Sequence, residues 1–76
     1  MKYINQAILE GKIIDITVNS DNSKQVLYIE NDDIFKILCS KDIMYNTGVD
    51  IRAVGSLTKL HGIVYLNADY IEEVKR

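Results

Sequence analysis

The chain has 76 residues, a net charge of −2, no proline and a single cysteine, and 47% of its residues are hydrophobic. This length allows one small domain over residues 1–76 with a packed core. A lone Cys39 excludes an internal disulfide, and one histidine cannot complete a metal site with it. Without an apolar run of membrane-spanning length or a signal-peptide core, we expect a cytoplasmic protein that has no membrane contact.

The first predicted strand covers residues 5–18, and its alternation changes phase along the way. Leu9, Gly11 and Ile13 share one face, whereas Ile14, Ile16 and Val18 share the other. One core cannot cover both sets on a uniform strand. We therefore predict a β-bulge near Gly11 or Ile13, with a strand covered on both faces as the alternative.

Two shorter strands follow, at residues 24–30 and 34–40, each preceded by a turn signal. The turn signals are the polar cluster at residues 19–23 and the pair Asn31-Asp32. In the strand at residues 24–30, Leu27 and Ile29 face the core, and Tyr28 faces outward. The strand at residues 34–40 places Phe35, Ile37 and Cys39 in the core and Ile34, Lys36 and Leu38 outside.

A connector without β pattern occupies residues 41–48 and is long enough for one helical turn, with Tyr45 placed to cap the barrel. A closing hairpin follows, with strands over residues 49–57 and 63–69 and a turn over residues 58–62. Its predicted inward residues on the two strands are Val49, Ile51, Ala53, Gly55 and Leu57, then Val64, Leu66 and Ala68. The alternation is interrupted near Tyr70, and Ile71 is predicted to face the core again after this irregularity.

This order of elements predicts an all-β fold, a five-stranded Greek-key OB-fold barrel with a short irregular or one-turn helical connector between strands three and four. Closure of the barrel would remove exposed strand edges. An SH3-like barrel is the main alternative. The long first strand with its central glycine and the position of the connector favour the OB-fold.

Two segments also resemble bacterial single-stranded DNA-binding proteins. Residues 5–12, NQAILEGK, are similar to an opening strand of the form Asn-x-x-x-Leu-x-Gly-Arg/Lys. Residues 48–57, GVDIRAVGSL, and 62–72, GIVYLNADYIE, are similar to the closing hairpin of those proteins, of the primosomal PriB type and of OB modules attached to some synthetases and polymerases. Tryptophan and an acidic tail, both typical of that family, are absent from this sequence. The resemblance therefore implies an accessory or mobile-element role in replication or recombination.

The same resemblance implies that bases stack on aromatic residues of the second and third strands while cations follow the phosphates. In this chain, the positions that could play these roles are the aromatic and basic residues that the strand alternation turns outward or that lie in the loops. The candidate nucleic-acid-binding residues are Lys24, Tyr28, Lys36, Arg52, Lys59, His61 and Tyr65.

We accordingly expect a binding protein for single-stranded DNA, with RNA as a further possibility, that forms a homodimer or larger homo-oligomer. No phosphate loop, nucleophile elbow or metal-ligand spacing occurs, so we expect no enzymatic activity, cofactor or small-molecule substrate. The negative net charge favours a second hypothesis, an OB module that binds only protein. Its interface residues would be the outward apolar side chains Ile34, Leu38, Val54 and Ile63.

Overall fold

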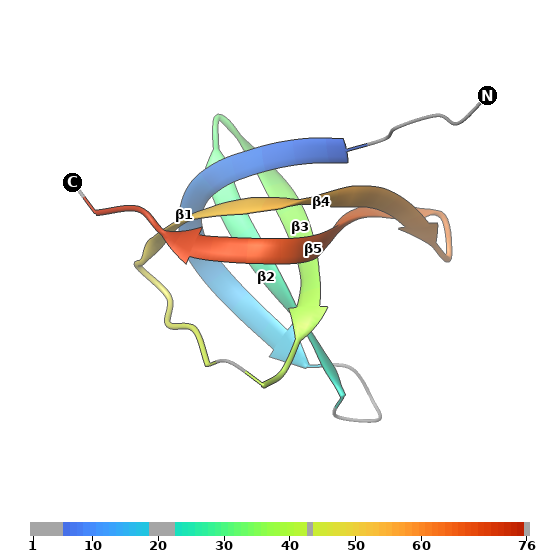
Figure 1. The fold of residues 1–76 in the computed structure, drawn as a ribbon, viewed down its shortest axis with the longest axis horizontal. Helices are drawn as coiled ribbons and strands as arrows, with labels where there is room; N and C mark the ends of the chain where they lie inside the picture. Colours follow the sequence, from blue (N-terminus) through green and yellow to red (C-terminus); the bar gives the residue numbers. More distant parts are fainter. Residues whose placement is uncertain (1–5, 19–22, 43, 76) are drawn as a thin grey trace.

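The computed structural model describes residues 6–18, 23–42 and 44–75, and β-strand is the only regular structure in these ranges (Figure 1). In chain order the strands are β1 (Gln6–Val18), β2 (Lys24–Asn31), β3 (Asp33–Ser40), β4 (Asp50–Leu60) and β5 (Ile63–Glu73). Most of the turn predicted at residues 19–23 lies outside the described residues, as do Tyr3, Asn5, Ile43 and Arg76. The described ranges contain no helix able to span a membrane.

The strands close into one barrel in the order β1-β2-β3-β5-β4. Neighbouring strands are antiparallel, except that β3 and β5 run parallel. This closed ring confirms the predicted five-stranded OB-fold, and the SH3-like alternative is not the fold observed. In a ring of this order, β4 lies across the barrel from β2 and β3.

β1 is long because it serves two neighbours, pairing with β4 from Gln6 to Lys12 and with β2 from Lys12 to Val18. Its register shifts between Ile13 and Asp15, which confirms the predicted bulge. The Asp15 carboxylate Oδ1 accepts a hydrogen bond from the Ile16 amide at 2.9 Å and so holds the bulge. Ile13 is buried before the shift, whereas Ile16 packs against the core after it. The bend therefore lets both halves of β1 face the same core.

The core draws on all strands, and its buried members are Ile13, Leu27, Ile29, Ile37, Cys39, Ile51, Ala53 and Leu66. Phe35 is half-buried and packs against them. The inward positions predicted for β2 and β3 are thus confirmed. Gln25 is the polar side chain buried among the described residues, and its Nε2 donates to the Ser40 carbonyl at 3.0 Å. This hydrogen bond satisfies a group that would otherwise be costly to bury.

The closing hairpin differs from its predicted form at the turn end. β4 and β5 stay paired to Leu60 and Ile63, so the loop is only His61-Gly62, with positive φ at both positions. Two positive φ angles make the type I′ turn that suits a two-residue hairpin. The strands therefore run past the end of the barrel (Figure 1).

Two predicted core positions are wrong because of this extension. Leu57 and Val64 lie on the inward side of the ladder, yet their exposed fractions are 43% and 56%. They stand on the part of the hairpin that has left the barrel, where no other strand covers them. Nearer the barrel, the register shifts between Val54 and Gly55, and Ile71 packs against the core as predicted.

The connector between β3 and β4 contains turns and no helix among its described residues, so the irregular form of the prediction is the one observed. Tyr45 is half-buried and packs against the core, which confirms its predicted capping position. The end of the connector is tied to the β1 bulge: the Gly48 amide donates to the Ile13 carbonyl at 2.7 Å, and the Ile13 amide donates to the Val49 carbonyl at 2.9 Å.

Candidate nucleic-acid interface

Three of the candidate residues lie side by side on the outer surface of β2, β3 and β5. Tyr28 and Lys36 are register partners, and the Lys36 Nζ is 6.0 Å from the centre of the Tyr28 ring. The parallel ladder pairs Ile37 with Leu66, and Lys36 and Tyr65, which come just before this pair, line the same groove between β3 and β5. We call Tyr28, Lys36 and Tyr65 the stacking row. Each side chain is half-buried, which holds the two rings and the cation against the barrel surface.

The stacking row has apolar and acidic neighbours. Val26 and Leu38 are register partners one step along β2 and β3, and they extend the surface beside the rings. Asp15 pairs with Tyr28 from the β1 side and places a carboxylate at the end of the row. Glu30 adds a second carboxylate one step along β2, where it pairs with Ile34. The surface can thus hold flat apolar groups, with one cation and two carboxylates to set the path of a charged ligand.

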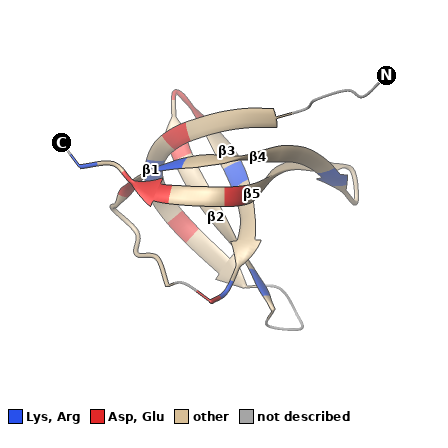
Figure 2. Cartoon of the chain, in the orientation of Figure 1, with Lys and Arg blue, Asp and Glu red and all other residues tan. Residues whose placement is uncertain are grey.

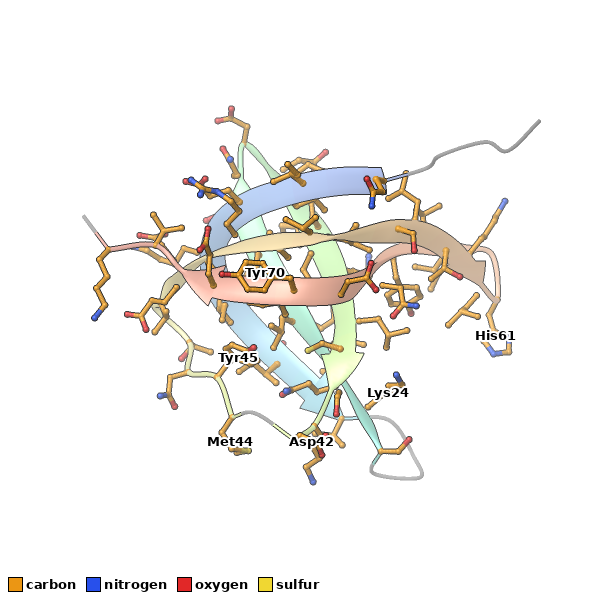
Figure 3. The ribbon with its side chains drawn as sticks, in the orientation of Figure 1. Lys24, Asp42, Met44, Tyr45, His61 and Tyr70 are labelled. Atoms are coloured by element: carbon orange, nitrogen blue, oxygen red, sulfur yellow. The ribbon has the colours of Figure 1, made fainter. Side chains whose placement is uncertain are left out.

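Three further candidates flank the stacking row. Lys24 begins β2 and pairs with Ser40 (Figure 3). Lys59 pairs with Val64 in the projecting hairpin, and His61 occupies its tip with a φ of 53°. All three side chains are exposed. The structure therefore places Lys24 at the start of β2, and Lys59 and His61 at the projecting end of the hairpin.

Arg52 lies elsewhere. Its guanidinium forms ion pairs with Glu10 at 3.2 Å and with Glu72 at 2.9 Å, both from strands beside β4. Hydrogen bonding to Glu10 is the main cause that raises the pKa of Arg52. Because β4 is across the barrel from β2 and β3, the structure does not bring Arg52 to the stacking row. Acidic positions follow β5 and part of β1 on this side (Figure 2).

An exposed apolar row lies beside these ion pairs. Ile8 pairs with Val54, and Val54 pairs with Tyr70. Ile8 is 64% exposed and Tyr70 is 56% exposed, and the Tyr70 side chain lies on the near side in Figure 3. The Tyr70 hydroxyl donates to Glu72 at 3.1 Å, and this bond raises the pKa of Tyr70. We call Ile8, Val54 and Tyr70 the apolar row.

The four residues predicted as a protein interface do not form one patch. Ile34 and Leu38 lie on β3 on the side of the stacking row, whereas Val54 belongs to the apolar row. Ile63 sits at the projecting end of the hairpin. Sequence alternation could place each of them outside but could not assign them to separate surfaces.

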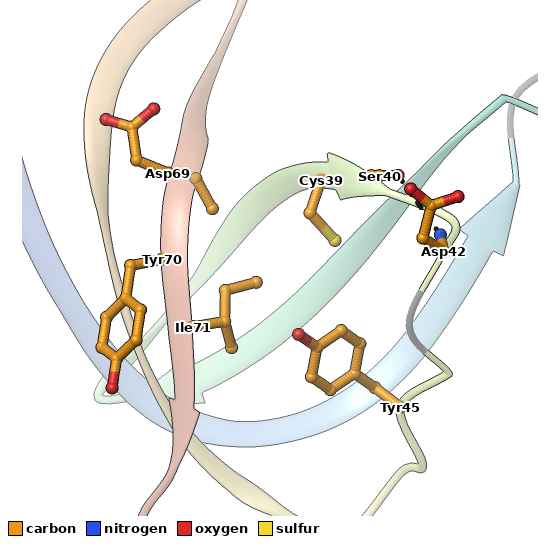
Figure 4. A pocket seen from close by; sticks show the side chains of 8 residues that line it. Cys39, Ser40, Asp42, Tyr45, Asp69, Tyr70 and Ile71 are labelled. Carbon is orange, nitrogen blue, oxygen red and sulfur yellow. Dashed lines mark hydrogen bonds between the residues drawn. The ribbon is translucent and has the colours of Figure 1, made fainter.

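A recess of about 370 Å³ lies between the end of β3, the connector and β5, with Cys39, Tyr45 and Ile71 pointing into it (Figure 4). Burial raises the pKa of the Cys39 thiol, and burial also raises the pKa of Tyr45. A thiol kept protonated is a poor nucleophile. Over the described residues there is no cluster of three or more His, Cys, Asp or Glu side chains that could hold a metal ion.

Comparison with known proteins gives the fold. No family model matches the chain, and no curated protein matches it in sequence. Among solved structures, the chain is similar to a chain of the S. pombe Stn1-Ten1 complex, with a TM-score of 0.81 and 18% identity over 96% of this chain. It is also similar to a chain of a Replication Protein A heterotrimer bound to single-stranded DNA, with a TM-score of 0.79 and 13% identity over 99% of this chain. The chain spans 60% and 62% of the lengths of those two chains.

Proposed function

We propose that this protein binds single-stranded DNA through the stacking row, without reading its sequence, in replication or recombination. The observation that carries the proposal is the juxtaposition of Tyr28, Lys36 and Tyr65 on the outer surface of adjacent strands. The similar fold in a complex described as bound to single-stranded DNA supports it, as does the resemblance of the opening strand to bacterial single-stranded DNA-binding proteins.

The mechanism follows from the chemistry of the row. Every base has a flat apolar face, so bases can stack on the tyrosine rings whatever their sequence, at about 1–3 kcal/mol per base. Lys36 lies between the rings, where a phosphate joining two stacked bases would pass. Lys24 and Lys59 extend the positive charge in both directions along the bound DNA strand. Each contact between a lysine and a phosphate releases counterions.

The negative net charge is compatible with this proposal because the charges are unevenly placed. Arg52 is paired with Glu10 and Glu72 across the barrel from β2 and β3. The Asp15 carboxylate is next to Tyr28 on the β1 side. The Lys36 side chain is next to Tyr28 on the β3 side. Glu30 also faces outward one step along β2, so a DNA strand on this surface meets two carboxylates but avoids Glu10 and Glu72.

The proposal is tested by fluorescence anisotropy of labelled oligo-dT at two salt concentrations. We expect binding at low salt that weakens strongly as salt is added, since phosphate contacts dominate the affinity. Absence of binding at low salt would overturn the proposal. Oligo-dT and oligo-rU measured side by side would show whether DNA is preferred over RNA.

A protein-contact module is a second candidate function, favoured by the exposed apolar row. Ile8 and Tyr70 leave more than half of their surface in solvent, as is common where a partner packs. We infer that the partner would be a second copy of the chain, as expected for a homo-oligomer. Light scattering of the wild type and of Ile8→Asp tests this, and a wild-type monomer at high concentration would exclude it.

A further inference from the structure

An apolar groove of about 430 Å³ opens beside the stacking row, between the projecting hairpin, β1 and the start of β3. Pairing between β3 and β5 begins at Ile37 and Leu66, so Lys36 and Tyr65, which come just before them, border a gap between the two strands. Ligand pockets commonly measure about 300–1,000 Å³. The groove is therefore large enough for a small aromatic group.

The groove has an apolar floor and a cationic rim. Leu9, Phe35, Leu57, Val64 and Leu66 supply hydrophobic surface, and Leu57 and Val64 are the inward-facing residues that the hairpin carries out of the barrel. Lys36 and Tyr65 carry the polar side-chain groups among the described lining residues, and none of those residues is acidic. Lys59 stands on the same side of the hairpin as Val64. The charge fits an anionic ligand with a flat apolar part.

The groove adjoins the stacking row. Lys36 and Tyr65 belong both to the stacking row and to the groove lining. If the bases of a DNA strand stack on Tyr28 and Tyr65, the next base of that DNA strand consequently lies at the groove mouth, with its phosphate beside Lys36. The ligand that would reach this groove is a base of the same strand.

We propose that the groove takes one base of the bound strand and favours thymine through its methyl group. This inference rests on the proposed function and deepens it. The floor offers no side-chain hydrogen-bond partner, so a base cannot bury its polar edge there without a penalty. A base can turn its polar edge to solvent and bury its apolar edge instead. Thymine carries a methyl group on its apolar edge. Uracil has the same polar edge but no methyl group.

The test compares oligo-dT with oligo-dU of the same length, which differ only in that methyl group. We expect oligo-dT to bind about fourfold tighter for one seated base, the effect of burying one methyl group. The variant Leu57→Gln/Val64→Gln should lose this preference and keep its affinity for oligo-dU. Both residues are partly exposed, so the fold should tolerate the change. The control Ile8→Gln/Tyr70→Gln changes two exposed apolar residues outside the groove and should keep the preference.

The outcomes separate this inference from the function on which it rests. Binding of neither oligonucleotide overturns the proposed function, and the groove assignment with it. Clear binding with equal affinity for the two overturns the groove assignment alone, as does a preference that survives Leu57→Gln/Val64→Gln. A wild-type dimer that this variant converts to a monomer, with the preference unchanged, would make the groove an interface between two copies instead.

Discussion

Lys36 lies across the β2–β3 ladder from Tyr28, with its Nζ 6.0 Å from the centre of the tyrosine ring. This distance is at the limit of a cation–π contact. Tyr65 lies on the other side of Lys36, on β5, across the groove that both residues line. An aromatic–cation–aromatic sequence of this kind suits a ligand that alternates flat bases with phosphates.

Removal of either ring in the stacking row should weaken binding of oligo-dT. For Tyr28→Ala or Tyr65→Ala we expect a loss of about 1–3 kcal/mol, the value of one base–aromatic stack. Anisotropy titration at low salt measures it. Tyr70→Ala is the matched control, since Tyr70 is an exposed tyrosine of the apolar row. Equal losses in all three variants would show that the stacking row is not the site.

Lys36 should contribute one phosphate contact. In Lys36→Gln we expect weaker binding and a salt dependence of log K that is shallower by about one unit of slope. Arg52→Gln serves as the control because the Arg52 guanidinium is engaged by Glu10 and Glu72. Its salt dependence should equal that of the wild type. A reduced slope in Arg52→Gln alone would move the phosphate path to the other side of the barrel.

Asp15 should oppose binding because it places a carboxylate beside Tyr28. Asp15→Asn keeps an oxygen that can accept the Ile16 amide hydrogen bond at the bulge, so the fold should be retained. We expect affinity for oligo-dT to rise a few-fold at low salt and the gain to fade as salt screens the charge. An unchanged affinity at low salt would place the bound strand away from β1.

Gly55 is required by the close approach of β4 and β5. A Cβ at this position would overlap the backbone of Asn67 and Ala68, so the strands would have to separate. We expect Gly55→Ala to lower the free energy of unfolding by about 3 kcal/mol or more, at the upper end for overpacked sites, because the atoms that it would meet are backbone atoms. At Gly62 a Cβ meets no atom within 4 Å, although φ is +81°. Gly62→Ala should therefore cost only about 1–2 kcal/mol of backbone strain.

Urea unfolding of the two glycine variants measures this difference. The same ranking should appear in their thermal midpoints. A Gly55→Ala protein as stable as Gly62→Ala would contradict the close strand contact.

Alkaline pH should destabilise the fold through Cys39. Burial raises the pKa of its thiol above the ordinary 9.0, so the folded state keeps a proton that the unfolded state releases. The stabilisation from this group is complete below about pH 9 and is lost as pH rises through the folded-state pKa. In Cys39→Val we expect a smaller fall in the urea midpoint between pH 8 and pH 10 than in the wild type. Identical falls would contradict a buried, protonated thiol.

Alternation in the sequence is enough to predict the strands, the bulge in β1 and the inward residues of β2 and β3. Each of these depends on one strand facing one core. The errors at Leu57 and Val64 have another cause: alternation gives the side of a strand but not where the barrel ends. That limit is set by the His61-Gly62 turn, which keeps β4 and β5 paired beyond the last covering strand.

The candidate site shows the same limit. Tyr28, Lys36 and Tyr65 come from three strands, and alternation predicts that each faces outward. Arg52 faces outward as well, yet its strand is across the ring from β2 and β3, beside Glu10 and Glu72. Strand order and register, which follow from pairing between distant segments, decide which outward residues meet.

The central claim is that single-stranded DNA lies on the stacking row, and NMR mapping of the backbone amides during titration with oligo-dT tests it most directly. We expect the largest shift changes at Tyr28, Lys36 and Tyr65, with small changes at Val54 and Tyr70. Changes centred on Val54 and Tyr70, or no change at low salt, would contradict the claim.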